Sequence, residues 1–75
     1  MVMKMSELKY VIIDNFWPII FPTNINHCDI AIGKNITSAG FINERGEVYG
    51  FSDTLNLHSK ESDQKLINRI LIRKI

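Results

Sequence analysis

The chain has 75 residues, of which 45% are hydrophobic and 23% are charged, and its formal net charge is +1. A chain of this size and composition is too apolar for intrinsic disorder and forms one domain with one small core. The near-neutral charge argues against a strongly basic nucleic-acid-binding domain. The single cysteine, Cys28, cannot form an intrachain disulfide, so we expect a reducing compartment such as the cytoplasm.

The sequence shows no segment that we expect to direct the chain into or across a membrane. The longest apolar run, Phe16 to Phe21, contains a proline and is much shorter than the roughly 20 residues of a membrane span. Residues 1–8 have neither the apolar core nor the cleavage site of a signal peptide. We therefore interpret residues 1–8 as a loose leader and residues 9–75 as one small domain, with no membrane among its partners.

Two runs rich in β-branched residues open the domain, Lys9–Asp14 and Pro18–Phe21. Such runs, separated by turn-forming residues, predict a hairpin. Its turn, Asp14–Trp17, begins with two residues that suit turns and ends with two aromatic residues, which are unusual at a hairpin tip. Pro18 has no N–H to donate, so it belongs at the start of a strand or on a sheet edge.

A short helix is predicted after this hairpin, between Thr23 and Gly33. Thr23 or Asn24 can cap its first amides, and Gly33 stands where a left-handed C-terminal cap would be. A strand over Asp29–Ile32 is the alternative, since a short apolar run fits both structures. In the helix, apolar residues recur at intervals of three and four and would face the sheet. They are Ile25, Cys28, Ala31 and Ile32.

The stretch Asn35–Leu57 predicts a second hairpin, in which the polar turn Asn43–Glu47 separates two strand-like runs. Gly46 can adopt the positive φ that a tight turn needs. Small residues in the strands leave room for a helix to approach closely, or for a bend in the ribbon. They are Ser38, Ala39, Gly40 and Gly50.

A second helix is predicted to follow, capped by Ser59 or Ser62, with acidic residues in its first turn. The apolar residues that share one face of this helix are Leu66, Ile67, Ile70 and Leu71. The resulting order is ββαββα, an α+β fold in which a four-stranded antiparallel sheet carries two helices packed on one face. The other face would stay apolar and uncovered, so we expect a homodimer.

No catalytic or metal site is predicted. His27 and Cys28 are adjacent, but consecutive residues of a helix point about 100° apart, so they cannot act as a base and its nucleophile. Only His58 could be that base, and a buried structural cysteine is the more ordinary interpretation. His27 is expected to hydrogen-bond a neighbouring carbonyl. The spacing of these residues is not that of a zinc site, so we expect a protein that is not an enzyme and has no cofactor.

Two groups of residues are instead candidates for binding. Phe16 and Trp17, at the tip of the first hairpin, could bind a partner protein, because Trp is enriched in interface hot spots. The alternative is that Trp17 folds back as a lid over the core. Lys65, Arg69 and Arg73 form a basic ridge along the second helix. This ridge could contact phosphates or an acidic protein surface, or it could simply be solvated.

Five segments between Lys9 and Leu71 have a pattern seen elsewhere. They are Lys9-Tyr10-Val11-Ile12-Ile13, Ile19-Ile20-Phe21-Pro22, His27, Ile36-Thr37-Ser38-Ala39-Gly40-Phe41 and Asp63-x-x-Leu66-Ile67-x-Arg69-Ile70-Leu71. Together they resemble a group of short uncharacterised proteins from bacteriophages and mobile gene cassettes. The resemblance implies no activity, and no residue gains a role from it. It implies a setting in which small proteins often act by binding.

The function expected from the sequence is therefore that of a small non-enzymatic protein-interaction module. It would be encoded by a phage or mobile element and would bind a host or phage protein in the host cytoplasm, for example as an inhibitor. The alternative is a nucleic-acid-associated module that uses the basic C-terminal helix.

Overall fold

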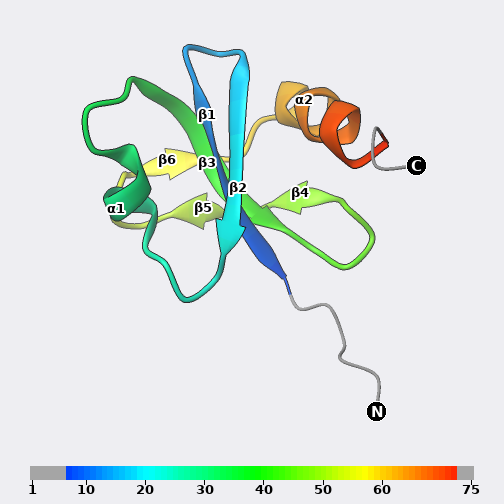
Figure 1. The fold of residues 1–75 in the computed structure, drawn as a ribbon, viewed down its shortest axis with the longest axis horizontal. Helices are drawn as coiled ribbons and strands as arrows, with labels where there is room; N and C mark the ends of the chain where they lie inside the picture. The colour runs from blue at the N-terminus through cyan, green and yellow to red at the C-terminus, as the bar shows by residue number, and fades with distance from the viewer. Residues whose placement is uncertain (1–6, 73–75) are drawn as a thin grey trace.

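The structure of the protein, a computed structural model, describes residues 7–72. The elements in chain order are β1 (Leu8–Ile13), β2 (Trp17–Pro22), α1 (His27–Ala31), β3 (Ile36–Ile42), β4 (Val48–Tyr49), β5 (Phe51–Ser52), β6 (Leu57–His58) and α2 (Glu61–Ile72). Four strands form one antiparallel sheet in the order β2-β1-β3-β4, and β5 pairs with β6 in a small second sheet (Figure 1). The predicted α+β class, four-stranded antiparallel sheet and two helices are confirmed.

The first hairpin is close to its prediction. Strand β1 pairs with β2 from Leu8 opposite Pro22 to Ile13 opposite Trp17. Asp14 and Asn15 turn the chain with φ angles of 53° and 59°, a left-handed conformation that these two residue types tolerate well. The strand begins at Leu8, one residue before the expected start of the domain, and residues 1–6 of the expected leader lie outside the described residues.

Strand β2 forms one edge of the sheet and contains two prolines. Alternate residues of an edge strand direct their backbone polar groups toward the partner strand and away from it. Pro18 and Pro22 lie in an uninterrupted pairing with β1, so their nitrogens point outward, as does the N–H of Ile20 between them. Ile20 is therefore the only outward donor of the three, and β2 is a poor edge for the addition of another strand.

The second hairpin has the predicted polar turn. Gly46 has a φ of 83°, and the side chain of Asn43 organises the loop, because its Oδ1 accepts the backbone N–H groups of Arg45 and Glu47, both at 2.9 Å. The strand that follows is shorter than expected. Gly50, with a φ of 80°, bends the chain out of the main sheet, so that Phe51 and Ser52 pair with β6 instead. The predicted order ββαββα therefore missed the small sheet.

The two helices lie on opposite faces of the main sheet, so the prediction that both pack on one face is wrong. Neighbouring residues of a strand point to opposite sides. Tyr10 and Ile12 pack with Ile67 of α2, whereas the cluster that contains Val11 packs with Ile30 of α1. Figure 1 shows the two helices far apart, with the central strands between them. The apolar face expected to need a second copy of the chain is therefore covered within this chain.

Helix α1 is shorter than predicted and presents a different face to the sheet. It begins at His27, which is only 4% exposed, and the chain leaves it through Gly33, whose φ of 74° fits the expected C-terminal cap. Cys28 is exposed, and Ile32 is 74% exposed, so the expectations of a buried cysteine and of an apolar face that contains both residues are wrong. The late start of the helix rotates His27 inward, where Ile25 from the preceding loop also packs.

Candidate functional site

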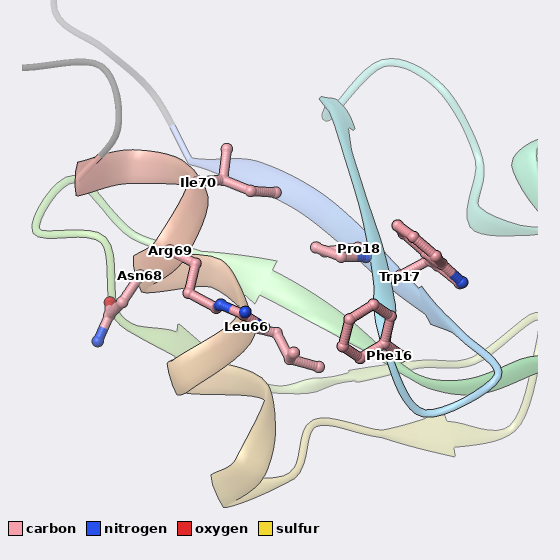
Figure 2. Close-up of a pocket in the computed structure, with 7 residues that line it drawn as sticks. All are labelled: Phe16, Trp17, Pro18, Leu66, Asn68, Arg69 and Ile70. Carbon is pink, nitrogen blue, oxygen red and sulfur yellow. The ribbon is translucent and has the colours of Figure 1, made fainter.

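Two aromatic side chains are exposed at the start of β2. Phe16 is 46% exposed and Trp17 is 60% exposed, and their rings meet edge to face with centroids 4.7 Å apart. Trp17 therefore does not fold back as a lid over the core. Its position explains this, because Trp17 and Pro18 are neighbours in a strand and point to opposite sides, and it is Pro18 that points toward α2 (Figure 2).

Helix α2 supplies the second wall of a groove that begins at these aromatic residues. Leu66 and Ile70 are half-buried, and Arg69 is exposed between them. Figure 2 shows Phe16, Leu66 and Arg69 extending into the space between β2 and α2, whereas Trp17 stands at the outer rim. The groove has a volume of about 680 Å³. The residues that line it are Phe16, Trp17, Pro18, Leu66, Asn68, Arg69 and Ile70.

The groove brings together three of the five binding residues predicted from the sequence. The guanidinium carbon of Arg69 lies 5.8 Å from the centroid of the Phe16 ring, within the range of a cation–π contact. The ring of Trp17 makes an edge-to-face contact with the same Phe16 ring. Lys65 is exposed on α2 one turn before Arg69 but does not line the groove, and Arg73 lies outside the described residues. Among the described residues of the predicted ridge, Arg69 is thus the one that lies at the predicted aromatic tip.

A buried carboxylate holds α2 in place beside the sheet. Asp63 is 2% exposed and accepts hydrogen bonds from the Tyr10 hydroxyl at 2.6 Å and from the Ser38 hydroxyl at 2.8 Å. It also accepts the backbone N–H of Lys60 at 2.9 Å, which caps the helix start. Burial raises the pKa of Tyr10 above its usual range, and the hydrogen bond to Asp63 raises it further. The phenol is therefore a neutral donor.

A side-chain amide provides the second attachment of α2. Gln64 accepts the backbone N–H of Val48 at 2.9 Å and donates to the carbonyl of Gly46 at 2.8 Å. The amide thus pairs with the backbone much as a further strand would, and it fastens the second hairpin to the helix. Sequence reasoning missed Asp63 and Gln64, because acidic and amide residues in the first turn of a helix usually face water.

His27 is buried on the face of the sheet that α1 covers, where its contacts are those of a structural residue. Its Nε2 donates to the carbonyl of Gly40 at 3.0 Å, which agrees with the predicted bond to a carbonyl but reaches a strand distant in sequence. Its ring packs edge to face against Phe21 and Phe41. Burial lowers the pKa of His27, and the nearby charge of Lys9 lowers it too. His27 is therefore an interior side chain held in its neutral form.

The other chemistry-bearing residues do not form a site around His27. His58 lies on β6, where its ring packs against Phe51 at 5.7 Å, and Cys28 is exposed on α1. Within residues 7–72, no group of three or more His, Cys, Asp or Glu side chains is arranged to hold a metal ion. The same part of the chain contains no helix of the length and apolarity that a membrane crossing requires.

A second group of exposed aromatic residues lies around the bend at Gly50. Tyr49 is 37% exposed and stacks on Phe41, and Phe51 is 50% exposed. A hydrogen bond from Tyr49 to Glu7 raises the pKa of this tyrosine to about 12. Glu7 therefore accompanies this second group, and Lys9 lies opposite Phe41 on the neighbouring strand. The groove between β2 and α2 differs in that its apolar walls surround an exposed guanidinium.

Comparison of the chain with protein-family models, with curated proteins and with solved structures finds no match. The fold and the groove define a small α+β domain with an aromatic and cationic surface site. The function of that site must therefore be inferred from its geometry.

Proposed function

We propose that the protein is a small non-enzymatic interaction module that binds a protein partner through the groove between β2 and α2. The observation that carries this proposal is the exposure of Phe16 and Trp17 beside the exposed cation of Arg69. A monomeric domain usually keeps large aromatic side chains out of water, and Trp and Arg are the residue types most enriched in interface hot spots. A host or phage protein is the partner class that the sequence resemblance suggests.

The site of action is proposed to be the cytoplasm. Cys28 is a free and exposed cysteine. An exposed thiol would readily form intermolecular disulfides in an oxidising compartment, whereas a reducing compartment keeps it free.

The test compares the groove with another exposed apolar residue of the same chain. Ile32 is 74% exposed and directly follows α1, on the other face of the sheet, so Ile32→Ala is a matched control for Trp17→Ala and Phe16→Ala. We expect wild type and Ile32→Ala to retain a partner from host extract that both groove variants lose. The retained protein, once purified, should shift the emission of Trp17, which is the only tryptophan of the chain.

The proposal fails if the purified candidate binds the groove variants as well as it binds wild type. It also fails if Ile32→Ala abolishes binding to the same extent, because the interaction would then depend on general surface apolarity.

A nucleic acid is the alternative ligand, because Arg69 lies over the exposed Phe16 ring and Lys65 is exposed one turn earlier on α2. Single-stranded nucleic acids also bind to aromatic rings accompanied by cations. This alternative predicts an electrophoretic shift of single-stranded DNA or RNA that weakens with salt and with neutralisation of Lys65, Arg69 and Arg73. If wild type shifts no nucleic acid at low salt, the alternative is excluded.

The predicted homodimer is a second alternative occupant of the groove. The homodimer was expected because one face of the sheet would stay uncovered, but in this fold both faces are covered. The two prolines on the edge of β2 also disfavour pairing between copies through that strand. Light scattering on wild type and on Phe16→Ala separates the cases. A dimer that Phe16→Ala converts to a monomer would place a second copy in the groove.

A further inference from the structure

The apolar and charged side chains that line the groove indicate what kind of peptide segment it can bind. Its walls are apolar, from Phe16 and Pro18 on one side and Leu66 and Ile70 on the other. Among the described residues that line it, Arg69 is the only charged one. A ligand that fills the groove must therefore offer a large apolar group together with an acceptor for one guanidinium.

Arg69 is available for such an acceptor. Arg69 is exposed, and its guanidinium lies over the face of the Phe16 ring. A guanidinium held over an aromatic ring keeps N–H donors for a further partner, and a carboxylate is the acceptor that matches its forked geometry. The ring contact also restricts the side chain before binding, which lowers the entropy cost of forming the ion pair.

The edge of β2 limits how the backbone of a ligand is held. Pro18 and Pro22 remove two outward donors from this strand, so a peptide cannot add to the sheet with a continuous ladder. Recognition must then come from side chains placed between β2 and α2. Within residues 7–72 the lining offers one cation, which disfavours a nucleic acid, because affinity for a phosphate backbone is built from many cationic contacts.

Building on the function proposed above, we propose that the groove recognises an acidic peptide segment of a partner protein. The segment places a large apolar side chain between Phe16 and Leu66 and a neighbouring Asp or Glu carboxylate on Arg69. Lys65, exposed one turn earlier on α2, adds a long-range attraction for further acidic residues without lining the groove.

The test is a selection of displayed random peptides on the wild-type protein, followed by calorimetric titration of synthetic peptides, a readout that also serves for Trp17→Ala, which has no tryptophan. We expect the selected peptides to pair Asp or Glu with Leu, Phe or Trp. Arg69→Glu should weaken these peptides by about tenfold or more, the loss expected for a charge-assisted hydrogen bond. Lys65→Glu makes the same change in net charge outside the lining and should have a much smaller effect.

A charge exchange gives the sharpest result. Peptides in which Lys replaces the selected acid should bind wild type poorly and should bind Arg69→Glu better than the acidic peptides do. The inference is overturned if the selected peptides carry no acidic preference, or if Arg69→Glu and Lys65→Glu weaken binding equally. If selection instead returns only peptides that still bind Phe16→Ala and Trp17→Ala, the proposed function of the groove fails as well.

Discussion

On the face of the sheet that α2 covers, several hydrogen bonds to one buried carboxylate join the helix to β1 and β3. On the face that α1 covers, apolar and aromatic contacts surround the hydrogen bond from His27 to the carbonyl of Gly40. Hydrogen bonds are directional, so the network around Asp63 determines where α2 lies. Apolar contacts tolerate small shifts more readily. The difference matters for function, because the groove is formed by α2 and β2 and depends on the placement of that helix.

Removal of the Asp63 carboxylate, which holds α2 on its face of the sheet, should cause the largest loss of stability. Asp63→Ala leaves the buried hydroxyls of Tyr10 and Ser38 without their acceptor and removes a helix cap, so we expect a loss of about 3 kcal/mol or more in the free energy of unfolding. Urea denaturation measures it, with Asp53→Ala, an exposed acid, as the control. If the two variants are equally stable, the network does not hold the helix.

Gly40 affects both faces and should give the next largest effect. A Cβ at this position would lie 2.6 Å from the backbone oxygen of Tyr49 and 3.1 Å from the Cβ of Ser59, and the carbonyl of Gly40 accepts the bond from His27. Because backbone must move, we expect Gly40→Ala to cost about 2 kcal/mol.

Gly33→Ala is the matched glycine control. Gly33 has a positive φ but no atom within 4 Å of the added Cβ, so its cost should be only about 1 kcal/mol, from backbone strain. Thermal unfolding by circular dichroism measures both variants. A larger loss for Gly33→Ala would show that close packing at Gly40 matters less than backbone conformation.

His27, on the face that α1 covers, should make the stability of the protein depend on pH. The pKa of His27 is lowered in the folded protein, so below about pH 6.5 the unfolded chain binds a proton that the folded chain does not yet bind. The free energy of unfolding should therefore decrease as the pH falls through that range. Urea midpoints at about pH 7 and about pH 5 should move less for His27→Gln than for wild type. His58→Gln, which removes an exposed histidine, is the control for the loss of an imidazole as such.

The smallest effect on stability is expected for Trp17, a residue proposed to bind the partner. Trp17 is 60% exposed, so Trp17→Ala should change the free energy of unfolding by no more than about 0.5 kcal/mol. Circular dichroism measures this change. A substantially larger loss would mean that Trp17 supports the hairpin rather than a partner, and the groove proposal would lose its main probe.

The sequence was sufficient for features that depend on local chemistry. Turn-forming residues predicted both hairpins, including the positive φ of Gly46, and the spacing of apolar residues predicted α2. Aromatic residues beside a proline and cations at intervals of four predicted Phe16, Trp17 and Arg69 as binding residues, although not as neighbours of one another.

Only the tertiary structure decided how these parts meet. Apolar residues on both sides of β1 are compatible either with one covered face and a dimer or with two covered faces, and the path of the chain after Gly50 selects the second arrangement. Asp63 is buried because Tyr10 and Ser38, distant in sequence, arrive opposite it. The groove exists because that carboxylate places Arg69 over Phe16, and contacts between distant segments have no local signal in the sequence.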